Sequence, residues 1–192
     1  YKRQRILSSG QASKILTSGA RIVICGEPNT GKSTLFNALI KHDRAIVTNI
    51  PGTTRDTIEE ELILDKNNVV LVDTAGLRST KNLVEKKGIE RTKEEIKNAD
   101  IVLSLFDSTK KEYKRKNNKN TLHIINKVDL LDKHSLNKLM EQNPGFIFIS
   151  AKEKRGLDKL LSEIENRVFN ITAKNNSLFL TSKRQELSLI HI

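Results

Sequence analysis

Residues 26–33 read GEPNTGKS, and this stretch decides the fold class that the rest of the chain must fit. It matches the pattern G-x-x-x-x-G-K-[ST], with the apolar run RIVIC (21–25) before it and a helical pattern (32–42) after it. In that setting the two glycines, Gly26 and Gly31, let the backbone curl so that its N–H groups point at phosphate oxygens. Lys32 would neutralise the β- and γ-phosphates of a nucleotide, and the Ser33 hydroxyl could bind Mg²⁺. The stretch predicts a phosphate-binding loop between a strand and a helix.

Further apolar runs are rich in β-branched residues and do not alternate, which is typical of strands buried on both faces. The five such runs are RIVIC (21–25), VVLVD (69–73), IVLSLFD (101–107), TLHIIN (121–126) and FIFIS (146–150). ELIL (61–64) precedes the second run, and the DKNN between them predicts a hairpin. Helical patterns lie at 32–42, about 84–98, about 135–142 and 156–169. We expect an α/β fold: a mostly parallel six-stranded sheet with one antiparallel edge strand and helices on both faces.

The two ends of the chain have a different hydrophobic pattern from its middle. They carry apolar spacing compatible with helices but no strand pattern, and the chain begins at Tyr1. We expect residues 1–17 to be a helical arm from a neighbouring domain and 173–192 to be the start of a returning helical domain. Residues 18–172 would then form the nucleotide-binding domain.

The composition of the chain indicates in which cellular compartment the protein works and which kinds of partner it could bind. The apolar runs are far shorter than the roughly 20 residues of a membrane span, so we expect no membrane contact. The single Cys25 excludes an internal disulfide and fits a reducing compartment, which predicts a cytoplasmic protein. The net charge is +11, and the densest basic cluster is KKEYKRKNNK (110–119). That cluster fits either a solvated loop or a contact with a polyanion such as RNA.

Two loop motifs complete the phosphate end of the predicted site. Asp73 closes a strand and begins DTAG, where its carboxylate can hold Mg²⁺ through water and the Gly76 N–H can meet the γ-phosphate. PGTTRD (51–56) lies between the first helix and the next strand, and a hydroxyl of Thr53 or Thr54 can complete the Mg²⁺ shell.

Two further motifs, NKVD (126–129) and SAK (150–152), each follow a predicted strand. They predict the base end of the site, where the base of the nucleotide would bind. Asn126 can bond the base edge and the Lys127 stem can cover the ring. Asp129 can accept N1–H and N2–H₂ of guanine, whereas adenine would leave the carboxylate unpaired, a difference worth roughly 10⁴ or more in discrimination. A backbone N–H of SAK can reach guanine O6. The order of all five motifs predicts GTP binding.

The residues expected at the nucleotide and its ions are Asn29, Thr30, Gly31, Lys32, Ser33, Thr34, Thr48, Asn49, Ile50, Pro51, Gly52, Thr53, Thr54, Asp73, Thr74, Ala75, Gly76, Asn126, Lys127, Asp129, Ser150, Ala151 and Lys152.

The chain resembles the translation-factor-like GTPases, and most closely the tRNA-modification GTPase family (MnmE/TrmE). The match is carried by KILTSGARIVICGEPNTGKSTLFNALI (14–40), RAIVTNIPGTTRDTIEE (44–60) and VDTAGLR (72–78) with LVEKKGIERTKEEIKNADIVLSLFD (83–107), and it covers roughly residues 12–170. The resemblance implies a Ras-like fold and GTP hydrolysis coupled to homodimerisation of the GTPase domains. In the intact protein it implies action on a tRNA wobble uridine with an FAD-dependent partner (MnmG/GidA). Ribosome-assembly GTPases share the GTTRD and DTAG segments and rank second. From a different class, a non-catalytic GTP-gated RNA-binding module is the alternative.

The resemblance also implies how hydrolysis proceeds. Many GTPases place a water-orienting glutamine after DTAG, but this chain has Leu77, which makes no hydrogen bond through its side chain. In the family a later glutamate orients the water, and Glu85 is the match. Its position alone does not decide this, because a glutamate in the first turn of a helix is common. Together with Lys32 and Thr54, it is the expected catalytic group.

The expected ions are Mg²⁺, at Ser33 and Thr54, and K⁺. By the resemblance, the K⁺ ligands would be Asn29, Thr48, Ile50 and Thr53. Neutral amide and carbonyl oxygens of this kind can replace the hydration shell of K⁺.

The chain departs from the family between the strands at 101–107 and 121–126. Only thirteen residues join them, where a helix is usual, so we expect the helix to be shortened or absent, and the sequence does not settle how that edge of the sheet forms. The family's C-terminal cysteine motif and folate-binding domain are also missing from the sequence. We expect this stretch to hydrolyse GTP but not to modify tRNA by itself.

Overall fold

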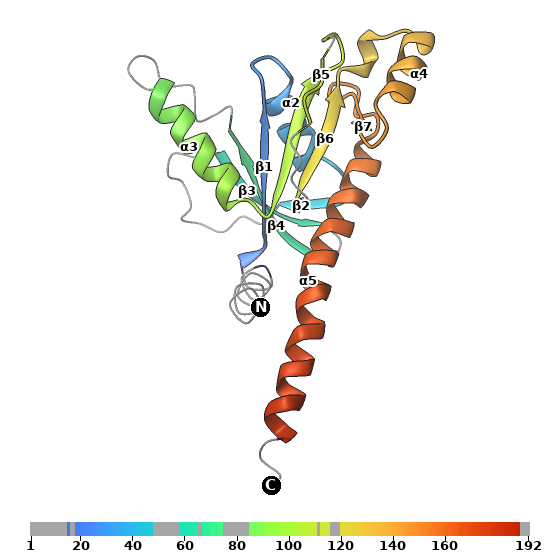
Figure 1. The fold of residues 1–192 in the computed structure, drawn as a ribbon. Helices are drawn as coiled ribbons and strands as arrows, with labels where there is room; N and C mark the ends of the chain where they lie inside the picture. Colours follow the sequence, from blue (N-terminus) through green and yellow to red (C-terminus); the bar gives the residue numbers. More distant parts are fainter. Residues whose placement is uncertain are drawn as a thin grey trace.

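The computed structural model describes residue 15 and residues 18–47, 58–64, 67–74, 85–110, 112–115 and 120–188. For residues 58, 85–91 and 174–188 it describes the backbone alone. The strands are β1 (Ala20–Gly26), β2 (Ala45–Val47), β3 (Ile58–Leu64), β4 (Asn67–Asp73), β5 (Ile101–Asp107), β6 (Thr121–Asn126) and β7 (Ile147–Phe148). The helices are α2 (Lys32–Ile40), α3 (Glu85–Asn98), the 3-10 turn η2 (Val128–Leu130), α4 (Lys133–Gln142) and α5 (Leu157–Ser188). Figure 1 shows them around one twisted sheet.

The strand order places the phosphate-loop motif at the centre of the sheet. The order is β2-β3-β4-β1-β5-β6-β7, and β1 pairs in parallel with both β4 and β5. The chain therefore builds one side of the sheet after β1 and then crosses to the other side. Ligands of open α/β sheets bind at the carboxyl ends of the strands at such a switch point, and residues 26–33 follow β1 there. The expected Ras-like fold class is confirmed.

The expected count of six strands was one short, and the hairpin strand is not the edge. β3 pairs antiparallel with β4, as the hairpin pattern predicted, but β2 then pairs antiparallel with β3 and lies outside it. β2 has only three residues, and its Ile46 is exposed. A strand this short carries no period that a sequence pattern could reveal.

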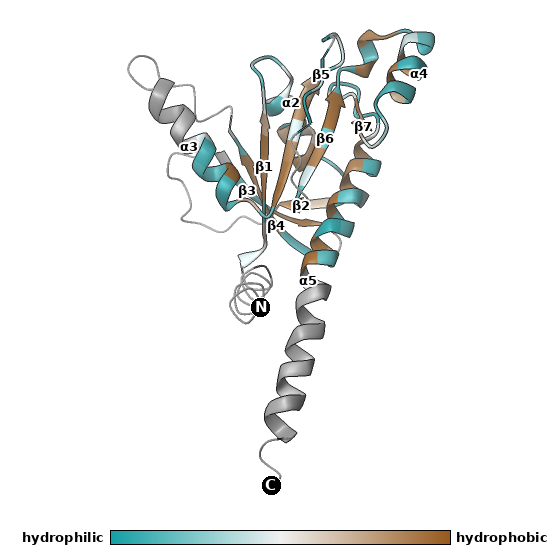
Figure 2. Ribbon diagram, in the orientation of Figure 1, coloured by the Kyte–Doolittle hydropathy of each residue, from teal (hydrophilic) through white to brown (hydrophobic). Residues whose placement is uncertain are grey.

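One face of the sheet is covered by α2 and α5. The alternate residues Ala20, Ile22 and Ile24 of β1 join the main hydrophobic core, which Leu35 and Leu39 of α2 complete from the helix side. From α5 the core receives Leu157, Leu160, Leu161, Ile164 and Val168. Figure 2 shows the central strands as the apolar part of the molecule. This packing fixes the start of α2, and with it Lys32 and Ser33, relative to β1.

The other face carries α3, which contacts β1. An ion-pair network holds it there: the Arg21 guanidinium on β1 lies 2.6 Å from Glu59 on β3 and 2.7 Å from Glu95 on α3. Burial lowers the pKa of Arg21, but the hydrogen bonds and charges of the two glutamates outweigh this, and the pKa is raised above its ordinary value. The network ties the helix that begins at Glu85 to the strand that leads into the phosphate loop.

The short crossover between β5 and β6 contains no helix in its described residues, 108–110, 112–115 and 120, as expected from its length. The sequence left that edge of the sheet open, and the structure shows β5 and β6 paired in parallel from Val102–Thr121 to Asp107–Asn126. Aromatic packing replaces the helix: Tyr113 meets the rings of Phe106 and Phe146 edge-on, and Arg115 lies over the Phe146 ring at 4.6 Å. Burial, with the charges of Arg115 and Arg167, lowers the pKa of His123, which stacks on Phe106 in the same cluster.

α5 runs without a break to Ser188 and extends well beyond the sheet (Figure 1). The domain boundary expected at 172/173 lies inside this helix. Among the described helices, none is both long and apolar enough to cross a membrane.

Candidate functional site

The phosphate loop joins β1 to α2 at the carboxyl edge of the sheet. Lys32 is buried, and its ammonium donates to the carbonyl oxygens of Gly26 at 3.1 Å and Glu27 at 2.8 Å. Ser33 and Thr34 follow in the first turn of α2 and are exposed. Asn29 is also exposed and has a φ of 63°, a left-handed conformation that asparagine tolerates better than most residues. The loop thus brings a buried cation, a free helix N-terminus and exposed hydroxyls to one place.

Gly31 is required by a close approach between two motifs. Its φ is 91°, and a Cβ there would lie 2.5 Å from Nδ2 of Asn126. Asn126 ends β6, and its Nδ2 donates to the Thr30 carbonyl at 2.9 Å. The phosphate loop and NKVD are therefore in direct contact, which only a residue without a side chain at position 31 permits.

Asn126 also connects to the third motif of the base end. Its Oδ1 accepts the Ala151 N–H at 2.9 Å, so one amide joins the phosphate loop, NKVD and SAK. The Ser150 hydroxyl accepts from Glu153 N–H and stabilises the same turn, in which Lys152 is exposed. In this structure the Asn126 oxygen and the Ala151 N–H, both expected at the base, bind each other. This bond joins the segment NKVD to the segment SAK.

Asp129 presents an acceptor that has no partner among the residues that the structure describes. It lies in η2, which the Val128 N–H fixes to the Ile149 carbonyl at 3.2 Å. Its Oδ1 is buried and accepts no hydrogen bond within the described part of the chain. A buried acceptor without a partner is costly, roughly 1–3 kcal/mol, and is rare outside functional sites.

Lys127 lies between Asn126 and Asp129 and is held by two residues that the sequence motifs did not single out. Its Nζ donates to Asp107 Oδ2 at 2.6 Å, and its carbonyl accepts from the Ser108 hydroxyl at 2.8 Å. One sequence feature could have pointed to these contacts: the segment DST (107–109) lies at the carboxyl end of the strand that precedes TLHIIN (121–126) in the chain.

The two loop motifs of the phosphate end, PGTTRD (51–56) and DTAG (73–76), are described only in part. Asp73 is buried at the end of β4, where it pairs in register with Ile24 of β1. Thr74 is buried too, and its hydroxyl donates to the Ile24 carbonyl at 2.7 Å. The other residues of interest in these two loops lie outside the described residues: Thr48, Asn49, Ile50, Pro51, Gly52, Thr53, Thr54, Ala75, Gly76 and Leu77.

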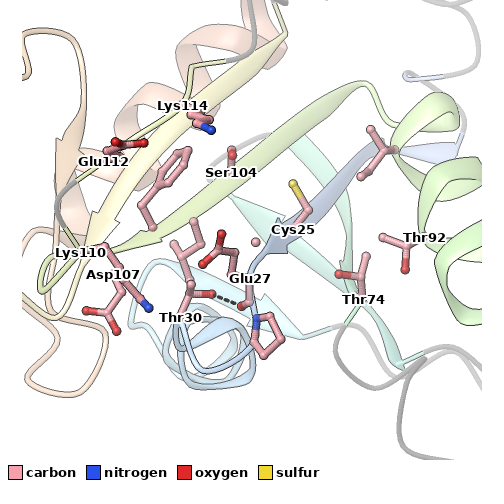
Figure 3. Close-up of a pocket in the computed structure, with 15 residues that line it drawn as sticks. Cys25, Glu27, Thr30, Thr74, Thr92, Ser104, Asp107, Lys110, Glu112 and Lys114 are labelled. Atoms are coloured by element: carbon pink, nitrogen blue, oxygen red, sulfur yellow. Dashed lines mark hydrogen bonds between the residues drawn. The ribbon is translucent and has the colours of Figure 1, made fainter. Parts of the chain in front are cut away.

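Glu85 is the first residue of α3, so the expected catalytic glutamate begins a helix. A cavity of about 840 Å³ lies between this helix and the β5–β6 crossover, in the size range of ligand pockets. Cys25 and Ser104 from the sheet, Thr92 from α3 and Lys114 from the crossover line it, and Figure 3 shows them around it. Thr30 of the phosphate loop and Asp107 at the end of β5 also line it, whereas Asn126 and Asp129 do not.

Comparisons with known proteins agree with this geometry. The family model described as "50S ribosome-binding GTPase" matches residues 21–141. The tRNA modification GTPase MnmE of Clostridioides difficile is 37% identical over 196 residues, covering 97% of this chain and 43% of that protein. MnmE of Thermotoga petrophila is 41% identical over 202 residues, covering 100% of this chain and 45% of that protein. The resemblance to the tRNA-modification GTPases is confirmed, and the chain spans less than half the length of these relatives.

A solved structure supports the same fold. Aquifex aeolicus Era bound to GDP and AlF4⁻ has a TM-score of 0.54 and is 26% identical, covering 75% of this chain and 55% of Era. The strand-to-helix phosphate loop, the contact of Asn126 with that loop and these likenesses lead to one conclusion. The chain belongs to the family of GTPases described as 50S ribosome-binding GTPases, and it is a GTP hydrolase.

Proposed function

We propose that this chain is the GTP-hydrolysing part of a cytoplasmic protein that modifies the wobble uridine of tRNA together with an FAD-dependent partner (MnmG/GidA). Two relatives named for tRNA modification match 97% and 100% of the chain at 37% and 41% identity. The observation that carries guanine recognition is Asp129 Oδ1, buried beside Lys127 and without a partner in the described chain. Guanine N1–H and N2–H₂ would supply the missing donors.

The residues at the phosphate end fit a magnesium ion. Mg²⁺ prefers oxygen ligands and keeps several waters, binding through one or two protein groups and substrate phosphates. Ser33 offers an exposed hydroxyl at the start of α2, and Asp73 a buried carboxylate at the end of β4. Thr54 would add a second hydroxyl, and bound Mg²⁺ would neutralise charge on the β- and γ-phosphates. Lys32, fixed over the loop, would supply a second positive charge to the same oxygens.

We further propose that hydrolysis is stimulated by K⁺ and by pairing of two GTPase domains across their switches. Asn29 is exposed on the phosphate loop, with a φ of 63°. With Thr48, Ile50 and Thr53 it would offer the neutral oxygens that K⁺ prefers. An ion there would place positive charge near the leaving phosphate oxygens, where other GTPases use an arginine.

The K⁺ proposal predicts a salt-specific rate. At equal ionic strength we expect GTP turnover to be faster in KCl than in NaCl by about tenfold or more, because Na⁺ is too small for a cage built for K⁺. Asn29→Ala should abolish the difference and leave GDP affinity within about threefold, since Lys32 and the loop amides remain. Phosphate release in the two salts measures this, and gel filtration with GDP and AlF4⁻ follows dimerisation. Equal rates in both salts would remove the K⁺ site.

The tRNA proposal needs a test in the intact context. A chimera of Thermotoga petrophila MnmE carrying residues 18–172 of this chain in place of its own GTPase segment should restore wobble-uridine modification. A Lys32→Ala chimera is the matched control and should not, because removing the P-loop charge abolishes the hydrolysis that drives the reaction. Mass spectrometry of digested tRNA gives the readout. A chimera that hydrolyses GTP at the parent rate yet leaves tRNA unmodified would count against this role.

A ribosome-assembly role is the second candidate. The family description and the likeness to Era favour it. Co-sedimentation of the GTP-bound chain with 50S subunits, compared with its binding to the FAD-dependent partner, separates the two roles.

A further inference from the structure

The base-binding lysine of this chain is held from two directions by the turn that follows β5. Lys127 has a φ of 67° and a ψ of 33°, a left-handed conformation that is costly for a lysine and persists only where the surroundings impose it. The Ser108 N–H donates to the Asn126 carbonyl at 2.9 Å, and the Ser108 hydroxyl donates to the Lys127 carbonyl at 2.8 Å. These two bonds lock the backbone on either side of the strained peptide.

Asp107 holds the other end of the same residue. Its Oδ2 lies 2.6 Å from the Lys127 ammonium, while its Oδ1 accepts both the N–H and the hydroxyl of Thr109, at 2.9 Å and 2.8 Å. The Asp107 side chain is 11% exposed and that of Lys127 is 31% exposed, so the more buried carboxylate, which Thr109 also holds, anchors the lysine. The register pairs Asp107 with Asn126, the residue before Lys127. The arrangement thus depends on β5 and β6 being neighbours.

The charge on Asp107 persists under ordinary conditions. Burial raises the pKa of its carboxyl, but the hydrogen bonds from Lys127 and Thr109 outweigh that effect and leave the pKa below its ordinary value. The stabilisation from this ion pair is therefore present above the ordinary pKa of aspartate, and it is lost only as the pH falls through the lowered value.

We propose that Asp107 is a positioning residue for guanine: it pins the Lys127 ammonium so that the side-chain stem lies ready over the face of the base. The inference rests on the proposed role of NKVD as the base site. A free lysine side chain has many rotamers, and fixing it on binding weakens affinity. With the head held by Asp107, that ordering is complete before the nucleotide arrives. Asp107 itself touches neither base nor phosphate in this role.

The test is a double-mutant cycle on GDP affinity, measured by calorimetry on the full chain. Asp107→Asn keeps the shape and can still accept from Thr109, but it removes the charge. We expect it to weaken GDP binding by about tenfold, the scale of one charge-assisted hydrogen bond. Lys127→Ala should weaken GDP by at least as much, and the Asp107→Asn, Lys127→Ala double variant should bind no more weakly than Lys127→Ala alone.

The control is Glu165→Ala, which breaks another close ion pair, between Arg44 and Glu165 at 2.6 Å, and neither residue belongs to NKVD or SAK. It should lower the melting temperature and leave GDP affinity unchanged, which separates a loss of packing from a loss of positioning. If the effects of Asp107→Asn and Lys127→Ala simply add, or if Asp107→Asn binds GDP like the parent while Lys127→Ala does not, the positioning role is wrong and the base site stands. If Lys127→Ala binds GDP normally, both the inference and the lysine's place in the base site fail.

Discussion

Asp129→Asn should turn this guanine-nucleotide site into one for xanthine nucleotides. The Asp129 Oδ1 is buried without a partner in the described chain, and guanine offers N1–H and N2–H₂ to a carboxylate at that place. An asparagine presents an N–H₂ where the carboxylate presented an oxygen, so it faces the guanine amine with a donor. Xanthine carries an oxygen at C2 and accepts from that amide. Sites built to bond a particular group reject the wrong one by roughly 10⁴ to 10⁵.

We therefore expect GTP affinity to fall by about 10³ or more, and xanthosine triphosphate to bind better than GTP. Calorimetry with the two nucleotides measures the switch. The fold should not suffer, because the substitution removes an unsatisfied buried charge rather than a contact. Asp132→Asn is the matched control: Asp132 caps α4 by accepting the Ser135 N–H at 3.0 Å, and asparagine caps almost as well. Unaltered GTP affinity in Asp129→Asn would place the guanine-reading group elsewhere.

The sequence predicted the buried strands well and the edge of the sheet poorly, for a physical reason. Strands such as 101–107 and 121–126 are buried on both faces, so their composition is uniform and their bounds match the structure. β2 is held by three residues of pairing to β3, and nothing in its composition requires a strand there. The length of the crossover predicted that its helix would be shortened or absent, and residues 108–110, 112–115 and 120 form none, but the packing of Tyr113 on Phe146 could not be predicted.

The candidate site, too, was predictable from the sequence in some respects and not in others. Sequence motifs predict the site residues Lys32, Asn126 and Asp129, because each motif has a fixed place after a strand. The contacts between motifs do not follow, since they depend on which strands become neighbours. Asp107 reaches Lys127 only because β5 and β6 pair in the register Asp107–Asn126, and no motif includes it.

Glu85→Ala should abolish most turnover while leaving nucleotide binding intact. Position 77 is a leucine, so no side chain there can hold the attacking water. Glu85 begins α3, which Arg21 ties through Glu95 to the strand that enters the phosphate loop. A carboxylate at the start of that helix could accept a hydrogen bond from water, directly or through a second water, and hold the nucleophile in line with the γ-phosphate.

Phosphoryl transfer depends mainly on positioning and charge, so losing that orientation should lower kcat by about 10² to 10⁴, or about 3–5 kcal/mol of barrier. GTP and GDP affinities should stay within about threefold, because the glutamate makes no ground-state contact with the nucleotide in this role. Glu85→Gln should behave alike, and K⁺-dependent dimerisation should persist in both. Single-turnover phosphate release gives the rate, and calorimetry gives the affinities.

Glu90, on the same helix, is the control for a general effect of charge on α3. Glu90→Ala should hydrolyse GTP at nearly the parent rate. A glutamate that only stabilised the helix N-terminus would contribute about 0.3–1 kcal/mol to folding and nothing to the chemical step. If Glu85→Ala loses stability on that scale but turns over GTP like the parent, the helix-dipole interpretation holds. The water would then have to be positioned by backbone groups or by the ion, because the side chain of Leu77 makes no hydrogen bond.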